Sequence, residues 1–238
     1  MRIKNKILSL IEKLNNNIFP KAKYNKNTLR YLLYEHAIKD SLNFVLLNFK
    51  YAEVFEKREN LYKWVLDRSI KKGLILEFGV HNGKSINAIA KLTDKKIHGF
   101  DSFEGLPMDG KLPTTKDDGV KWYVGKMNNF GKMPNVKKNV KLHKGWFNET
   151  LPNFFLKEKE KIALMHIDCD IYSSTMSVLK NSKKHITSGT IIIFDEYLNY
   201  EGWQKNEHRA FQEFCKKFKF KFDFIAYTYK GQVAVRIK

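Results

Sequence analysis

The sequence contains few of the residues that mark the more unusual classes of protein chain. Its 238 residues include two cysteines, Cys169 and Cys215, five prolines and 13 glycines. Two distant thiols provide neither a disulfide framework nor the clustered cysteines of a zinc site. So few glycines and prolines exclude a collagen-like or linker-rich chain. The longest fully apolar runs, such as Phe44–Leu47, are far shorter than the about 20 residues that cross a bilayer.

The N-terminal residues also lack the pattern of a secretory signal. Charged residues bracket the short apolar stretch Ile7–Ile11, whereas a signal needs about 7–15 apolar residues followed by small ones. The basic amphipathic stretch at 3–14 is compatible with a membrane surface, but its spacing favours a surface helix packed on its own domain. We therefore expect a cytoplasmic protein without stable membrane insertion.

Arginine is scarce in a strongly basic chain. The formal net charge is +19, yet only six of the 44 basic residues are arginines, and the lysines are spread over every segment. Specific recognition of phosphates and bases favours the bidentate arginine fork. We therefore favour a solvated lysine surface and expect no nucleic-acid partner. The alternative is attraction to nucleic acid, to an anionic membrane or to a phosphorylated substrate.

The apolar residues that are present predict an α/β fold. A 43% hydrophobic share excludes wholesale disorder. From residue 73 onward, strands alternate with helices, which predicts a mainly parallel sheet covered on both faces and a final hairpin with one antiparallel strand. The expected strands lie at 74–79, 96–101, 140–143, 162–168, 189–195, 220–226 and 232–237.

The first 70 residues show helical spacing and no strand alternation. We expect an N-terminal helical segment at 1–70, which caps the active site or forms a dimer contact, followed by a second unit at 71–238. The long, weakly patterned stretch Ser102–Asn139 predicts a lid or binding loop. The helices expected in the first segment lie at 3–14, 29–38, 43–51 and 54–70.

A glycine turn follows the first of these strands. Within Leu76–Ser85, Gly79 and Gly83 allow the backbone to approach a ligand closely, although their spacing matches neither GxGxxG nor a P-loop. Asp101 ends the next strand, where an acid can accept hydrogen bonds from both hydroxyls of an adenosyl ribose. Each feature alone also suits a structural turn or a helix cap, but together they favour a cofactor site.

Acidic residues follow two later strands. Asp168 ends the strand at 162–168 and is followed by Asp170, and Asp195 ends the strand at 189–195 and is followed by Glu196. The carboxyl ends of adjacent parallel strands meet at the crevice where ligands bind. Converging carboxylates repel one another unless a cation lies between them, and Mg²⁺ or Ca²⁺ is the natural choice. The alternative is a set of solvated loop acids, one of which caps the following helix.

Five motifs occur within roughly residues 70–215. In chain order they are Leu76–Ser85, Gly99–Pro107, Lys144–Phe147 with Thr150–Pro152, His166–Thr175 and Phe194–Tyr197. With these motifs the chain resembles the TylF-type, macrocin O-methyltransferase-like family of class I S-adenosylmethionine (SAM) methyltransferases, which methylate sugars in macrolide biosynthesis. This resemblance implies a Rossmann-like class I methyltransferase sheet of seven mostly parallel strands with an antiparallel last strand.

The resemblance also implies the residues that bind SAM and Mg²⁺. Asp168 is the expected catalytic base, with Asp170, His166 and His81 as weaker candidates. The expected metal ligands are Asp168, Asp195 and Glu196, the last standing where better-known metal-dependent relatives have Asp or Asn. The expected cofactor contacts are Glu77, Gly79, Asn82, Ser85, Asp101, Ser102, Phe103, Gly145, Trp146 and Asp168.

The activity implied by the resemblance is SAM-dependent, Mg²⁺-assisted O-methylation of a sugar hydroxyl in a glycoside, a nucleotide sugar or a glycan precursor. A metal on the substrate oxygen lowers the pKa of that oxygen and fixes its direction. We expect Trp203, Glu207 and Arg209 to line the pocket for this sugar-containing acceptor. The alternatives are a catechol or amino acceptor, a nucleic-acid-binding protein, and a scaffold without catalysis.

Overall fold

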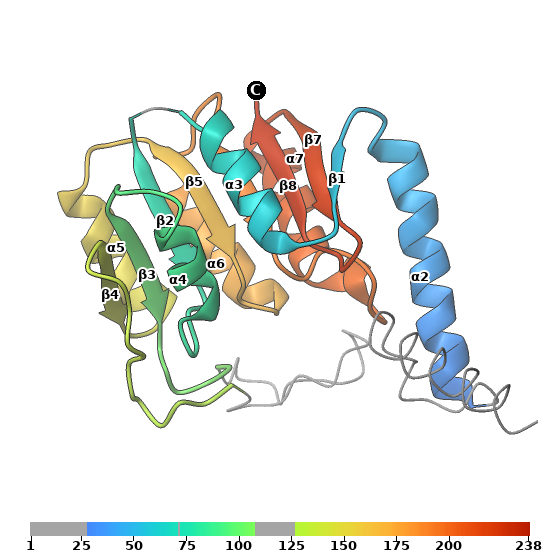
Figure 1. The fold of residues 1–238 in the computed structure, drawn as a ribbon, viewed down its shortest axis with the longest axis horizontal. Coiled ribbons are helices and arrows are strands. Elements are labelled where there is room, and N and C mark those ends of the chain that lie inside the picture. The colour runs from blue at the N-terminus through green and yellow to red at the C-terminus, as the bar shows by residue number, and fades with distance from the viewer. Residues whose placement is uncertain (1–27, 71, 108–126) are drawn as a thin grey trace, which may run out of the picture.

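A computed structural model describes residues 28–70, 72–107 and 127–238 of the chain. Eight strands form a single sheet in the order β1-β7-β8-β6-β5-β2-β3-β4 (Figure 1). Within the described ranges β8 alone runs antiparallel to its neighbours, which confirms the expected C-terminal hairpin. The strands are β1 (Glu53–Phe55), β2 (Leu74–Phe78), β3 (Ile97–Asp101), β4 (Val140–Lys144), β5 (Ile162–Ile167), β6 (Ile191–Phe194), β7 (Phe222–Thr228) and β8 (Val233–Ile237).

The strand order reverses between β2 and β5. From β2 the chain proceeds outward to β3 and β4, and it then returns to β5 on the opposite side of β2 before continuing to β6. Loops that leave the carboxyl ends of β2 and β5 therefore diverge, which opens the crevice where α/β sheets bind ligands. The glycine turn and the first acidic pair lie at this point of the sheet.

Helices cover both faces of the sheet. Figure 1 shows α3 (Arg58–Arg68) and α4 (Lys84–Ala90) on one face, with α5 (Phe147–Lys157), α6 (Tyr172–Ser182) and α7 (Glu207–Phe218) on the other. Successive residues of β5 enter opposite cores, with Leu164 facing α3 and α4 and Met165 facing the other layer. Because both faces are covered, every residue of this strand is buried, and all of them are apolar except His166.

The N-terminal segment differs from the expected series of helices. One continuous helix, α2 (Leu29–Asn48), replaces the two predicted at 29–38 and 43–51, because no proline or glycine interrupts it. Residues 53–55 form β1, which pairs with β7 and raises the number of strands from the expected seven to eight. Three residues are too few to show an alternating pattern.

The boundary at residue 70 stays a prediction, although β1 and α3 join the sheet and its helical layer. The helix expected at 3–14 and the middle of the expected loop, 108–126, lie outside the described residues. Helix α5 was not expected, and it contains Pro152, which is a poor helix former. None of the helices that the structure describes has both the length and the apolar character needed to cross a membrane.

Candidate active site

A cavity of about 280 Å³ lies at the carboxyl ends of β2, β3, β5 and β6. Its wall includes the turn after β2, Asp101 at the end of β3, and Asp168, Asp195 and Glu196 after β5 and β6. Most of the residues expected to bind the cofactor and all three expected to bind the metal therefore line one cavity, as the parallel strands predicted.

Gly79 brings two strand ends into contact at the floor of this cavity. Its φ of +91° is a left-handed value, and a Cβ built there would lie 1.6 Å from the carbonyl oxygen of Asp168. Its amide donates to the carbonyl of Phe100 at 2.9 Å, and the amide of Asp168 donates to the carbonyl of Phe78 at 2.8 Å. Glycine is thus required here by the backbone of the neighbouring strand as well as by any ligand.

The carboxylate of Asp101 holds the glycine turn in shape. Its Oδ2 accepts hydrogen bonds from the amides of Val80 at 2.8 Å and His81 at 2.7 Å, and its Oδ1 accepts one from Phe103 at 2.6 Å. His81 has a φ of 46°, an uncommon value for a residue other than glycine, and these bonds help to maintain it. Asp101 is therefore a structural part of the turn in addition to lining the cavity.

Eight of the ten residues expected to contact the cofactor line the cavity, and two do not. The side chains of Glu77 and Phe103 are fully buried. Phe103 packs in the hydrophobic core beneath the turn, and Glu77 accepts a hydrogen bond from the Ser85 hydroxyl at 2.9 Å. The lining residues are Gly79, Asn82, Ser85, Asp101, Ser102, Gly145, Trp146 and Asp168.

The residues expected to form the acceptor pocket lie elsewhere. Trp203 is 2% exposed and packs edge-on against Phe44 at 5.2 Å, and Glu207 is fully buried. Arg209 is exposed on α7 and pairs with Glu213 at 2.8 Å. None of the three lines the cavity: Trp203 packs against α2, whereas Glu207 lies just behind the cavity wall, where its Oε2 accepts a hydrogen bond from the amide of Glu196 at 3.1 Å.

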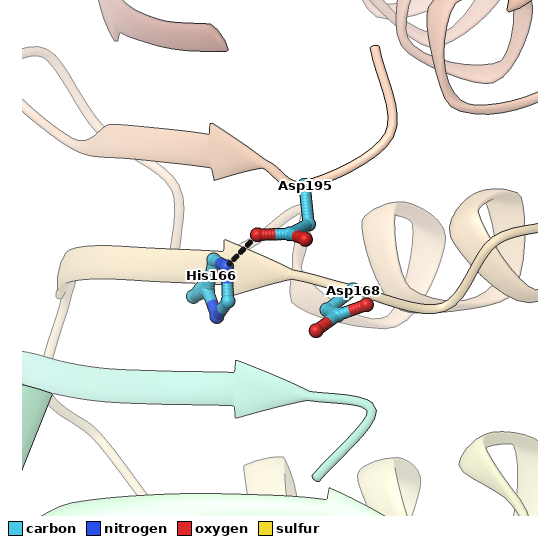
Figure 2. A group of neighbouring side chains, drawn as sticks. All are labelled: His166, Asp168 and Asp195. Atoms are coloured by element: carbon cyan, nitrogen blue, oxygen red, sulfur yellow. Dashed lines mark hydrogen bonds and ion pairs between the residues drawn. The ribbon is translucent and has the colours of Figure 1, made fainter. Parts of the chain in front are cut away.

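The strand-end acids form two overlapping groups. The side chains of His166, Asp168 and Asp195 offer ligand atoms within 4.8 Å of one another (Figure 2), and so do those of Asp168, Asp170 and Glu196. Asp168 belongs to both groups, whereas Asp195 and Glu196 each belong to one. The structure therefore assembles the predicted ligands around Asp168.

Asp168 and Asp195 have different pKa values because their surroundings differ. Burial and the nearby charge of Asp195 raise the pKa of Asp168 well above its usual value. Burial also acts to raise the pKa of Asp195, but hydrogen bonding and charge from His166, together with the charge of Arg58, lower it below its usual value. Asp195 is thus the ionised member of the pair, and Asp168 has the greater affinity for a proton.

His166 lies between two carboxylates. Its Nδ1 is 3.1 Å from Glu77 Oε2, and its Nε2 is 3.3 Å from Asp195 Oδ1. Burial acts to lower the pKa of His166, but the hydrogen bonds to Asp195 and Glu77 raise it well above its usual value. His166 does not line the cavity, so among the weaker candidates for the base only His81 and Asp170 do.

Sequence reasoning missed Arg58, which stands at the first turn of α3 and lines the cavity. Its Nη1 lies 4.0 Å from Asp195 Oδ2, and its side chain is 31% exposed. No local pattern in the segment before residue 70 marks this arginine, because the strand that brings α3 against the sheet was not foreseen.

Comparisons with known proteins identify the family. A family model described as macrocin O-methyltransferase (TylF) matches residues 55–229. The mycinamicin III 3''-O-methyltransferase of Micromonospora griseorubida is 25% identical over an alignment of 162 residues, and the match covers 59% of this chain and 63% of that protein. The 8-demethyl-8-(2,3-dimethoxy-alpha-L-rhamnosyl)-tetracenomycin-C 4'-O-methyltransferase of Streptomyces olivaceus is 27% identical over an alignment of 141 residues, and the match covers 52% of this chain and 53% of that protein. The chain thus spans between about half and two thirds of the length of these relatives.

Solved structures share the fold. The calicheamicin methyltransferase CalS11 superposes with a TM-score of 0.57 at 22% identity, covering 94% of this chain and 90% of that one. The O-methyltransferase NovP gives 0.53 at 21% identity, covering 75% and 78%. These likenesses establish the class I methyltransferase fold. Because the family model spans more than half of the chain and includes the glycine turn, Asp101 and the strand-end acids, the chain belongs to the macrocin O-methyltransferase (TylF) family.

Proposed function

We propose that the protein is a SAM-dependent, Mg²⁺-assisted O-methyltransferase that acts on a sugar hydroxyl in a glycoside, a nucleotide sugar or a glycan precursor. The observation that carries this proposal is the single cavity that contains both the glycine turn with Asp101 and the acids around Asp168. The family supports methyl transfer, and the name of the Streptomyces olivaceus relative supports a sugar, since it specifies a rhamnosyl compound.

The residues around the glycine turn fit SAM. Gly79 has no side chain to block the cavity floor, and Oδ1 of Asp101, which accepts one hydrogen bond where Oδ2 accepts two, has a lone pair left for a ribose hydroxyl. Ser102, Gly145 and Trp146 line the same wall and would flank the adenosine. When bound, SAM supplies a methyl group on a sulfonium that a nucleophilic oxygen can displace.

The strand-end acids fit Mg²⁺. Hard divalent cations prefer carboxylate oxygens. Oxygens of Asp168, Asp170 and Glu196 lie within 4.8 Å of one another, and so do oxygens of Asp168 and Asp195. Glu196 Oε2 is buried without a hydrogen-bond partner among the described residues, which is costly unless something binds it. Asp168, Asp195 and Glu196 would hold the ion, which would lower the pKa of a bound hydroxyl and fix its orientation.

In this proposal Asp168 accepts the proton of the acceptor hydroxyl. Its burial and the charge of Asp195 give it a greater proton affinity than an ordinary carboxylate has, which suits a general base. Arg58 and His166 keep Asp195 ionised beside it. Leu106, Pro107 and Met127 form an apolar part of the wall and would limit the entry of water.

We further propose that the segment before residue 71 forms a homodimer contact. Helix α2 packs on the sheet through Phe44, which contacts Phe224 at 5.7 Å, yet Leu46 and Leu47 remain 71% and 83% exposed. A second copy of the chain would cover this apolar surface. Sedimentation equilibrium tests this point, because a monomer at all concentrations would exclude it.

A SAM-consumption screen tests the main proposal. The wild-type chain is incubated with SAM, Mg²⁺ and a panel of nucleotide sugars, glycosides, catechols and amines, and the products are analysed by mass spectrometry. We expect a gain of one methyl group on a sugar oxygen and loss of activity in EDTA. Methylation of only a catechol or an amine would refute the proposed acceptor, and no binding of S-adenosylhomocysteine would refute the proposed cofactor.

A further inference from the structure

His166 connects the glycine-turn side of the cavity with the side that carries the strand-end acids, although His166 itself does not line the cavity. Its side chain, on β5, has no exposed surface. One ring nitrogen faces Glu77 at 3.1 Å and the other faces Asp195 at 3.3 Å (Figure 2 shows the bond to Asp195). Glu77 in turn accepts the hydroxyl hydrogen of Ser85 at 2.9 Å, next to the glycine turn. Hydrogen bonds therefore run without a gap from the cofactor turn to the acid after β6.

Both ring nitrogens of His166 already face a carboxylate. Nδ1 faces Glu77 Oε2 and Nε2 faces Asp195 Oδ1, and the side chain has no exposed surface and does not line the cavity. A ring nitrogen that donates to a carboxylate has no lone pair free for a metal ion. His166 therefore belongs to the group with Asp168 and Asp195 by proximity and is not placed to act as a ligand.

Packing fixes the ring in this orientation. The ring of Tyr62 on α3 meets the imidazole edge-on, with the centroids 5.3 Å apart and an interplanar angle of 71°. The Tyr62 hydroxyl also lies 3.4 Å from Nε2. Since both side chains are fully buried, the imidazole has little freedom to turn away from the carboxylates.

We propose that His166 is a positioning residue that holds the Asp195 carboxylate, and with it the metal site, in a fixed relation to the cofactor turn. This inference rests on the proposed function, in which Asp195 is a metal ligand. The bond to His166 occupies Oδ1, while Oδ2 lies 4.0 Å from Arg58, which lines the cavity. A carboxylate held in this way keeps its orientation before the ion arrives.

Two variants separate the two hydrogen bonds of His166. The side-chain amide nitrogen of asparagine lies near the position of Nδ1, and that of glutamine lies near the position of Nε2. His166→Gln should therefore keep a donor toward Asp195, and His166→Asn should keep one toward Glu77. Tyr62→Phe is the matched control, because it removes the neighbouring hydroxyl and leaves both carboxylate contacts in place.

The measurements are Mn²⁺ binding to the full chain by electron paramagnetic resonance and S-adenosylhomocysteine binding by calorimetry. We expect His166→Asn to weaken Mn²⁺ binding about tenfold or more, the usual loss for a partner of a metal ligand, and His166→Gln and Tyr62→Phe to stay within about threefold of wild type. Equal losses in the two His166 variants would overturn the inference.

A second measurement uses only the wild-type chain and so does not depend on how the variants fold. Electron spin echo modulation of bound Mn²⁺ should show no directly coordinated imidazole nitrogen, and such a nitrogen would make His166 a ligand and overturn the inference. If the wild type binds S-adenosylhomocysteine but no Mn²⁺, both the metal in the proposed function and this role of His166 fall. Mn²⁺ binding with equal losses in the variants would remove the role of His166 alone.

Discussion

Replacement of Asp101 by alanine should destabilise the protein as well as weaken cofactor binding. The carboxylate accepts three backbone hydrogen bonds, from Val80, His81 and Phe103, at 2.6–2.8 Å. Hydrogen bonds to a charged group contribute about 1.5–3 kcal/mol each, so three set an upper bound of about 5–9 kcal/mol. Water can reach this wall of the cavity and solvate the released amides. We therefore expect Asp101→Ala to lower the free energy of unfolding by about 2–4 kcal/mol.

Asparagine at position 101 should have a smaller effect. Its single carbonyl oxygen can still accept the amides of Val80 and His81, whereas its NH₂ group would face the amide of Phe103. We expect a loss of about 1–2 kcal/mol for Asp101→Asn. The assay is urea unfolding followed by circular dichroism, together with calorimetric titration of S-adenosylhomocysteine for each variant.

The matched control is Asp67→Ala, which removes an exposed acid that pairs with Lys63 on α3. Exposed pairs contribute little, so this change should cost at most about 1 kcal/mol. If Asp101→Ala unfolds within about 0.5 kcal/mol of wild type, the carboxylate does not hold the turn. If stability falls but S-adenosylhomocysteine affinity does not, the predicted contact with the ribose is refuted.

Three further predictions concern Gly79 at the floor of the cavity, the strand-end acids and the buried His208. Gly79→Ala should abolish S-adenosylhomocysteine binding or folding, because the new Cβ would lie 1.6 Å from a backbone oxygen. Gly189→Ala is the control, since Gly189 has a similar φ of +87° but a Cβ there would lie 3.2 Å from a side-chain atom. Equal effects of the two changes would contradict the steric argument. With a methyl acceptor identified, EDTA should stop turnover and Mg²⁺ should restore it, and full activity in EDTA would remove the metal from the proposal. Asp168→Asn should cost more activity than Glu196→Gln, and both variants should still bind S-adenosylhomocysteine, because neither residue is a main anchor of the cofactor. Burial lowers the pKa of His208 to about 4, so between its ordinary value of 6.5 and about 4 the unfolded chain binds a proton that the folded chain does not. Urea unfolding should therefore show stability falling as the pH drops through this range, less so in His208→Gln, and an unchanged pH dependence in that variant would contradict the assignment.

The positions of the strand-end acids could be predicted because they depend only on strand order and direction. Asp168 and Asp195 follow the apolar runs that become β5 and β6, and adjacent parallel strands must end at the same edge of a sheet. The same reasoning placed Asp101 beside the glycine turn. In each case a local pattern marks the end of the strand, and the topology of the sheet then brings the side chains together.

Other parts of the site could not be predicted from a local pattern in the sequence. Strand β1 has three residues, so the position of α3, and with it Arg58 at the cavity, could not be inferred from periodicity. Glu77 and Phe103 stand within recognisable motifs, but whether their side chains point into the cavity or the core depends on packing between helices and sheet. The sequence patterns predict the order of most strands, whereas these orientations arise from the tertiary contacts.

The structure also explains how two neighbouring carboxyl groups acquire different roles. Asp195 has two cationic neighbours, His166 at 3.3 Å and Arg58 at 4.0 Å, which stabilise its ionised form. Asp168 is half-buried beside Asp195 and Asp170, so its ionised form is disfavoured. Acids whose surroundings push their pKa values apart are suited to separate tasks. This asymmetry is the physical reason for assigning the proton to Asp168 and a fixed negative charge to Asp195, and it depends on a histidine that never reaches the cavity.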